Sequence, residues 1–266
     1  MEWPEARARL AAPIFAPLQP ILSQLPGERW PTLDELSALA ANVRTAMDRP
    51  VRFVAPDRMA GDRLTYERHI AMTGEVPSRP RNWHDLFNAL CWITWPLTKA
   101  KINAQHVALL DERGDAELRQ RGPERDSLTL FDEGGVIVAA SDPALLQLVR
   151  DFCWKELFWE RRAEAEARLR FFVFGHGCYE QALAPYLGMV AKTVFVPVDE
   201  LFHLLPIEVQ LPRVDALAAA FFASRIRFSS PKSLAPMPIL GVPGWHFGEQ
   251  DEAFYSDAKH FRSKPR

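Results

Sequence analysis

The sequence predicts an α+β protein that is mainly helical and has a small mixed sheet, including a β-hairpin near residues 127–140. Long segments carry apolar residues at helical spacing, whereas several short segments rich in β-branched and aromatic residues have the length of strands. Hydrophobic residues make up 48% of the chain and charged residues 25%, which is typical of a protein with a packed core.

Helical signals dominate the first half of the chain. The proline-rich segment 1–31 favours short helical turns and an extended wrap. Thr32 then has the features of an N-cap, with Glu35 completing a capping box, and apolar spacing continues the helix to about residue 47. Beyond it we expect a short strand at 51–54, a helix within 62–76, and helices at about 83–95 and 99–113 that form an antiparallel hairpin.

The second half begins with the strongest hairpin signal. Residues 127–131 and 136–140 flank Asp132-Glu-Gly-Gly135, which has good turn chemistry. A helix should start at Asp142-Pro143 and run through Trp159 into the charged stretch 160–168. Buried strands near 170–174 and 192–198, a helix over 212–227, and a Pro/Gly-rich C-terminal strap should follow. Because no linker or repeat divides the chain, we expect one globular domain over residues 1–266.

Charge and cysteine content exclude several classes of function. The chain has 32 Lys and Arg against 34 Asp and Glu, so its net charge of −2 gives no general nucleic-acid signature. Three widely spaced cysteines form no CxxC pair and favour free thiols in a reducing compartment. The absence of a signal peptide or a bilayer-length apolar segment predicts a cytoplasmic protein without membrane insertion. Cofactors and partners are unknown from the sequence, and a small molecule is left open.

Polar residues on the two central helices suggest a shared site. On the first helix, His84 and Asn88 share the polar wedge of an otherwise apolar surface. On the second, Asn103 and His106 lie within the apolar side, so the four side chains are expected to converge. This pattern has two interpretations: a structural hydrogen-bond network that fixes the helix pairing, or a pocket in which a histidine acts as base or ligand.

Further candidates lie near strand ends. Gly175-His176-Gly177 follows a buried strand and opens a helix, where ligands commonly bind, with Glu180 one turn later. Asp126 precedes the predicted hairpin, beside an arginine that suits a phosphate, and Asp132 and Glu133 could offer oxygen ligands to a metal ion. The structural alternatives are a tight glycine turn and surface ion pairs.

Cys178 offers a different chemistry. It lies in the first turn of the helix that His176 opens, where the pKa of a thiol can fall. A Cys–His–Asn hydrolase built from Cys178, His106 and Asn103 is therefore conceivable, on residue types alone.

Several motifs follow one another in a specific order along the chain: Asn82-Trp-His-Asp-Leu-Phe-Asn-Ala-Leu90, Asn103-Ala-Gln-His106, Arg125-Asp-Ser-Leu-Thr-Leu-Phe-Asp-Glu133, Phe174-Gly-His176 and Leu240-Gly-Val-Pro-Gly-Trp245. Together they resemble a bacterial family catalogued as domain of unknown function 3025. The resemblance covers about residues 60 to 262 and implies no activity, cofactor or partner. A small aliphatic residue is usual in this family where the chain has Cys178, which weakens the cysteine hypothesis.

Two hypotheses for function result. The first is a hydrolase, with metal dependence left open and a phosphodiester-type substrate, whose pocket gathers His84, Asn88, Asn103, His106, His176 and Asp126, with Asp132 and Glu133 as metal ligands. The second is a non-catalytic binding or scaffold protein in which the same polar residues form a structural network. A solvent-connected cleft would favour the first, and a sealed network would favour the second.

Overall fold

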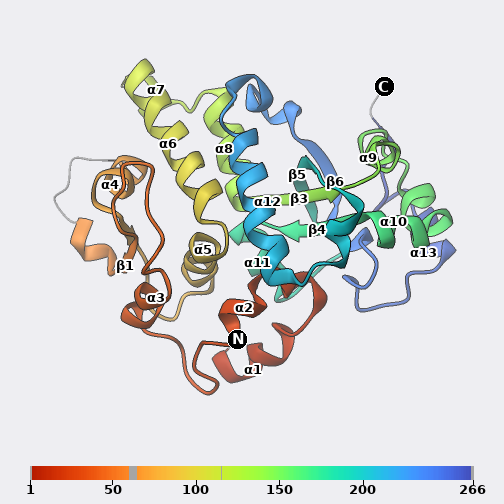
Figure 1. Cartoon of the computed structure of the whole chain (residues 1–266), viewed down its shortest axis with the longest axis horizontal. Helices are drawn as coiled ribbons and strands as arrows, with labels where there is room; N and C mark the ends of the chain where they lie inside the picture. The colour runs from red at the N-terminus through yellow and green to blue at the C-terminus, as the bar shows by residue number, and fades with distance from the viewer. Residues whose placement is uncertain (1, 60–64, 115, 265–266) are drawn as a thin grey trace.

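A four-stranded mixed sheet lies at the centre of the computed structural model, which describes residues 2–59, 65–114 and 116–264 (Figure 1). The strand order is β4 (Leu169–Val173), β3 (Gly135–Ala140), β5 (Val190–Pro197) and β6 (Ala235–Pro238). β3 runs antiparallel to β4 and parallel to β5, while β5 and β6 are antiparallel, so the predicted mixed sheet is confirmed. Every residue of β3 is buried, which explains its uninterrupted apolar sequence.

Helices surround this sheet and confirm the predicted mainly helical α+β class. In Figure 1 α12 crosses in front of the sheet, α4 to α6 lie beside it, and α9, α10 and α13 lie at its other end. A separate parallel pair is formed by β1 (Arg52–Val54) and β2 (Glu75–Pro77). The helices are α1 (Trp3–Arg9), α2 (Gln19–Leu22), α3 (Leu33–Leu39), α4 (Tyr66–Thr73), α5 (Trp83–Thr94), α6 (Pro96–Arg113), α7 (Ala116–Arg119), α8 (Pro123–Gly134), α9 (Pro143–Arg150), α10 (Arg162–Arg168), α11 (His176–Ala182), α12 (Ile207–Phe221) and α13 (Glu252–Ser256).

The predicted N-caps are confirmed, although the helices that follow are often shorter. Thr32 and Glu35 form the capping box of α3, which nevertheless ends at Leu39 rather than near residue 47. Asn82 accepts a hydrogen bond from the backbone N–H of Asp85 at 3.0 Å, and Asp142 caps α9. α9 then ends at Arg150, and Phe152 adopts a φ of 60°, which breaks the long helix expected to reach residue 159.

The predicted β-hairpin near 127–140 is wrong. Its first half is part of α8, and only its second half is a strand, β3. Leu128 and Leu130 alternate as in a strand, but Leu128 and Phe131 are also spaced as on one face of a helix. The structure has the helix, with Leu128 and Phe131 buried and Leu130 42% exposed. Gly122-Pro123 supplies the helix start, and the strand partners of β3 come from distant segments, β4 and β5.

Three other boundaries differ from expectation. The helix predicted over 62–76 is α4, and residues 62–64 of that prediction lie outside the described residues. α5 and α6 are joined by Trp95 alone, and Figure 1 shows α5 nearly end-on but α6 lengthwise, so they meet steeply rather than as an antiparallel hairpin. α12 begins at Ile207, five residues before the predicted start at Pro212, and ends at Phe221 rather than at residue 227.

The sheet brings distant segments to one edge. Because β3 and β4 are antiparallel, with Val136 paired to Val173, the start of β3 and the end of β4 lie together. The end of α8 therefore meets the start of α11, and α5 packs against α11. In the described part of the chain no helix is long and apolar enough to cross a lipid bilayer.

Candidate functional site

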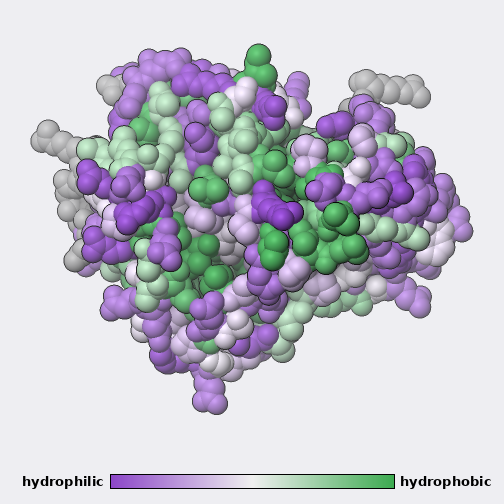
Figure 2. All heavy atoms as spheres, in the orientation of Figure 1, coloured by the Kyte–Doolittle hydropathy of each residue, from purple (hydrophilic) through white to green (hydrophobic). Residues whose placement is uncertain are grey.

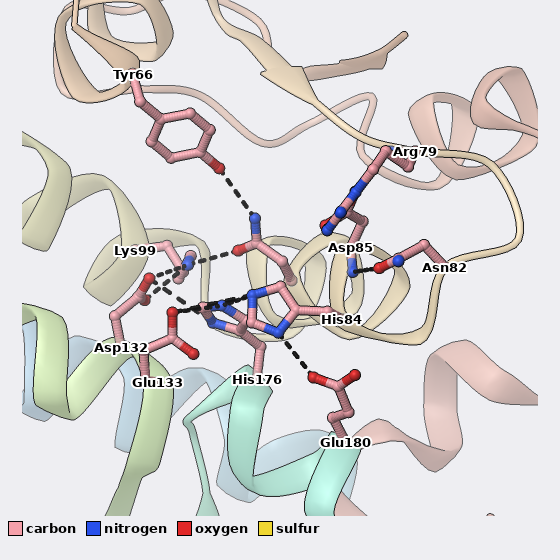
Figure 3. Close-up of polar contacts among 11 residues, drawn as sticks. Tyr66, Arg79, Asn82, His84, Asp85, Lys99, Asp132, Glu133, His176 and Glu180 are labelled. Atoms are coloured by element: carbon pink, nitrogen blue, oxygen red, sulfur yellow. Dashed lines mark hydrogen bonds and ion pairs between the residues drawn. The ribbon is translucent and has the colours of Figure 1, made fainter. Parts of the chain in front are cut away.

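Seven of the eight predicted site residues line one cavity of about 360 Å³, a volume in the range of small-molecule sites. The cavity is reached from solvent between α4, α5, α6, α8 and α11, and several of its side chains are shown in Figure 3. The seven residues are His84, Asn88, Asn103, His106, Asp132, Glu133 and His176. The convergence expected from the helical wheels is therefore observed, although the helices are arranged differently.

Asp126 is not among the residues that line the cavity. It lies seven residues before Glu133 on α8, hence on a similar face but about 10 Å away along the helix axis. The structure does not bring it to the other candidates.

Three potential metal ligands meet where α5, α8 and α11 converge. The Nε2 atoms of His84 and His176 are 3.1 Å apart, and Oε1 of Glu133 lies 3.5 Å from Nε2 of His176 and 3.9 Å from Nε2 of His84. In a tetrahedral zinc site with bonds of about 2.0–2.1 Å, ligand atoms are about 3.3–3.4 Å apart. The three atoms therefore have the spacing of a metal site (Figure 3).

A carboxylate lies behind each of the two imidazoles. Nδ1 of His84 is 2.8 Å from Oε2 of Glu180, which favours the tautomer with its proton on Nδ1 and a free lone pair on Nε2. Nδ1 of His176 is 3.8 Å from Oδ2 of Asp132 and has no hydrogen-bond partner, although the side chain is only 6% exposed. The His84–Glu180 contact is the carboxylate–histidine pairing that orients metal-bound imidazoles, whereas Asp132 lies near Nδ1 of His176 without a hydrogen bond to it.

The position of Asp132 changes its predicted role. Its carboxylate accepts hydrogen bonds from Nζ of Lys99 at 2.7 and 3.0 Å, away from the two facing Nε2 atoms. Burial alone would raise the pKa of Asp132, but Lys99 and His176 outweigh burial, so that the pKa lies below its ordinary value. Asp132 therefore pairs with Lys99 behind His176, and only Glu133 of the two predicted oxygen ligands lies with the two histidines.

Lys99 and Tyr66 are part of the site but were missed in the sequence. Nζ of Lys99, whose side chain is 5% exposed, also donates to Oδ1 of Asn88 at 2.8 Å, and Nδ2 of Asn88 donates to the hydroxyl of Tyr66 at 3.1 Å. Lys99 precedes Asn103 and His106 by four and seven residues, so the helical face that identified these two could have identified it. No pattern in the sequence pointed to Tyr66.

Close approach of backbones explains the glycines on either side of His176. A Cβ at position 175 would lie 2.4 Å from the backbone nitrogen of Gly135. A Cβ at position 177 would lie 2.8 Å from Oε2 of Glu133. The Gly-His-Gly sequence therefore lets α11 start directly against the end of α8, which places His176 beside Glu133.

For a metal ion held by His84, Glu133 and His176, Gly177→Ala should weaken binding, because the added methyl group displaces the Glu133 carboxylate. We expect a loss of affinity of about tenfold or more, similar to the loss of an outer-shell partner. Alanine normally stabilises a helix relative to glycine by about 1 kcal/mol, so any destabilisation would itself report the clash. Gly27→Ala is the control, since nothing lies within 4 Å of a Cβ there. Equal metal affinity of the Gly177 variant and the wild type, measured by calorimetry, would contradict this account.

The part of the cavity wall around Arg125 is a buried network of hydrogen bonds and ion pairs. Arg125, with a side chain 5% exposed, donates through Nη2 to Oε1 of Glu67 at 2.9 Å and through Nε to Nδ1 of His106 at 3.3 Å. Nδ2 of Asn103 donates to the backbone oxygen of Glu67 at 2.9 Å. Burial, together with the charge of Arg125, holds the pKa of His106 well below its ordinary value, and the imidazole is neutral at neutral pH. Asn103 and His106 thus match the network interpretation better than the catalytic one.

The structure argues against Cys178 as a nucleophile. Its side chain is buried, it does not line the cavity, and burial raises the pKa of the thiol to about 12. A protonated thiol is a poor nucleophile, so the Cys–His–Asn arrangement is not supported.

Comparison with known proteins identifies the family of the chain. No curated protein and no solved structure gives a significant match to the chain. A protein family, described as a protein of unknown function (DUF3025), matches residues 51–265, which include every side chain at the candidate centre. This match covers most of the sequence, and the chain belongs to the DUF3025 family.

Proposed function

We propose that the protein is a metal-dependent hydrolase whose divalent ion is held by His84, Glu133 and His176. The observation that carries the proposal is the triangle of ligand atoms, with sides of 3.1, 3.5 and 3.9 Å. Two histidines and one glutamate leave coordination positions open, as catalytic zinc sites do. An ion bound in this way lowers the pKa of a coordinated water to about 7, which supplies a nucleophile at neutral pH.

The electrostatics of the triangle also favour a cation. Glu133 is close enough to His176 that this contact lowers the pKa of the carboxyl group, although partial burial opposes the shift. With the proton of His84 directed to Glu180, the Nε2 lone pair of His84 faces Nε2 of His176. Two imidazole nitrogens 3.1 Å apart need a proton or a metal ion between them.

The cavity beside this centre has the properties of a substrate site. Arg121 lines it and suits an anionic group, whereas Arg79 is paired with Asp85 at 2.7 and 3.0 Å and has only its remaining N–H groups to offer. Trp92 and Ile102 provide apolar surface. The hydroxyl of Tyr66, held by Asn88, is a donor for a substrate oxygen. Together these groups suit a small phosphodiester, whose leaving oxygen and charge need stabilisation.

The test is hydrolysis of a chromogenic phosphodiester by the full chain. We expect protein stripped with a chelator to be inactive and zinc or manganese to restore hydrolysis of bis(p-nitrophenyl) phosphate in parallel with bound metal, measured by elemental analysis. A carboxylate ester, p-nitrophenyl acetate, serves as a second hydrolytic substrate. Absence of metal binding, or metal binding without hydrolysis of either substrate, would overturn the proposal.

The same three ligands also occur in non-haem Fe(II) oxygenases, so metal identity is part of the test. Anaerobic loading with Fe(II), followed by measurement of oxygen consumption in the presence of candidate substrates, separates the two chemistries. Oxygen consumption that depends on iron, without hydrolysis under zinc or manganese, would replace the hydrolase by an oxygenase.

A further inference from the structure

A second cavity, of about 500 Å³, lies at the opposite end of β4 from His176. Its walls come from the N-terminal segment, from β4, from the start of α12 and from the strap that contains Val242, Pro243 and Trp245. The metal centre does not use this strap, although it is one of the motifs that the sequence made prominent. In Figure 2 hydrophobic residues gather over the segment that joins β5 to α12, where Leu201 and Leu204 are 70% and 81% exposed.

Arg170 places a cation without a carboxylate partner in the wall of this cavity. Three of its N–H groups point to main-chain oxygens: Nη1 donates to Glu166 and Leu169, and Nη2 donates to His203 at 3.2 Å. A guanidinium has five N–H donors, so two remain free. Among the described residues no carboxylate forms a salt bridge with Arg170, and desolvation lowers the pKa of this half-buried group although the charge of Glu166 opposes the shift. Glu166 also lines the cavity, but its carboxylate pairs with Nε of Arg162 at 3.0 Å. The free donors of Arg170 therefore suit an anionic partner.

Gln210 adds an unpaired acceptor beside this arginine. Its side chain is 94% buried, and Nε2 donates to the backbone oxygens of Phe202 and Leu205 at 3.2 and 2.8 Å. Oε1 accepts no hydrogen bond from the described residues. Arg170 and Gln210 both line the cavity and donate to the main-chain oxygens of His203 and Phe202, so both side chains approach the same turn of the chain. A ligand anion at Arg170 would therefore meet an acceptor close to its charged group.

Aromatic and aliphatic side chains complete the cavity. Phe171 and Trp245 meet edge to face, with ring centroids 6.4 Å apart, and both line the wall. Leu169, Leu205 and Ile207 extend the apolar surface. Burial and the charge of Arg170 lower the pKa of His203, which is therefore neutral and leaves Arg170 as the cation beside Gln210.

We propose that this cavity binds a small organic acid that has an apolar body and a hydrogen-bond donor next to its carboxylate. The carboxylate takes the two free donors of Arg170, the neighbouring hydroxyl or amine donates to Oε1 of Gln210, and the body packs against Phe171 and Trp245. Apolar 2-hydroxy and 2-amino acids have this chemistry. The site is separate from the proposed metal centre, and its existence does not depend on the proposed hydrolase activity.

Three matched probes test the recognition by calorimetry on the full chain: 3-phenyllactate, 3-phenylpropionate, which lacks the donor, and 3-phenyl-1,2-propanediol, which lacks the carboxylate. We expect 3-phenyllactate to bind at least about tenfold more tightly than either analogue, since each analogue leaves a buried polar group unpaired. Equal binding of the diol would overturn the role of Arg170, and equal binding of phenylpropionate would overturn that of Gln210. No binding of any probe would overturn the site.

Three variants test whether 3-phenyllactate binds in this cavity. Arg170→Met should abolish binding of 3-phenyllactate, while Arg213→Met, an exposed arginine on the same helix as Gln210 but outside the cavity wall, should not change it. Ala16→Phe should block the cavity by volume and keep Arg170 intact, which covers the case that the Arg170 variant is unfolded. Retention of binding in folded Ala16→Phe would place the ligand elsewhere and contradict the proposal.

Discussion

His84→Ala is expected to abolish stoichiometric metal binding and metal-dependent hydrolysis while the metal-free protein remains folded. The substitution removes one of three ligands, and losses should exceed the roughly 10–100-fold typical of an outer-shell partner. The side chain of His84 is 34% exposed and its Glu180 partner is 45% exposed. We therefore expect the free energy of unfolding of the metal-free protein to change by no more than about 1 kcal/mol.

A matched substitution separates the metal centre from general effects of losing an imidazole. His260→Ala removes a histidine far along the chain that does not line the cavity, and metal content and hydrolysis should be unchanged. Glu180→Gln should weaken metal binding by about 10–100-fold without abolishing it, because it alters only the group that orients His84. Normal metal content of His84→Ala, measured by elemental analysis after dialysis, would refute the assigned centre.

Arg125→Met is expected to have the opposite effect, a large loss of stability. The guanidinium pairs with Glu67 at 2.9 Å and with Glu117 at 3.5 Å, and the side chains of Arg125 and Glu117 are 5% and 4% exposed. Removing one partner of a buried ion pair leaves an uncompensated charge and costs about 3–5 kcal/mol. Urea unfolding should therefore show a much lower midpoint for this variant.

Arg113→Met provides a control that shares one partner. Arg113 also contacts Glu117, at 3.0 Å, but its side chain is 32% exposed, so its removal should cost about 1 kcal/mol or less. Metal affinity of the folded Arg125 variant should match that of the wild type, because the network does not touch the ligand triangle. Two results would contradict the proposed roles of the ligand triangle and of the Arg125 network. One is wild-type stability of Arg125→Met, and the other is loss of metal by this variant while it is still folded.

One part of the cavity wall carries the three potential metal ligands, and another carries the buried network around Arg125. Helical spacing correctly brought His84, Asn88, Asn103 and His106 to one cavity, because the apolar faces of α5 and α6 leave few directions for polar groups. Spacing on single helices could not show that Arg125 faces His106 or that Glu180 faces His84. These contacts join residues 19 and 96 positions apart and depend on tertiary packing.

The fold itself was predictable where local chemistry and packing agree. The caps at Thr32, Asn82 and Asp142 were correct because a short polar side chain meets free N–H groups over a few residues. The predicted hairpin was wrong because the apolar residues of 127–131 fit both the spacing of a strand and that of a helix. The pairing of β3 with the distant strands β4 and β5, rather than with this segment, could not be seen in the local sequence. β6 was missed because two of its four residues are prolines, which normally indicate a loop.

The ligands of the proposed centre come from residues 84, 133 and 176, far apart in the chain, and this separation couples metal supply to the folding equilibrium. An unfolded chain offers no preformed site, so an ion that binds only the native state stabilises it by mass action, by about 2.7 kcal/mol when free metal exceeds the dissociation constant a hundredfold. Protein purified from cells grown with a high concentration of the preferred ion should therefore melt at a higher temperature than protein from ion-depleted cells. The melting temperature would then report the fraction of protein that has bound the ion.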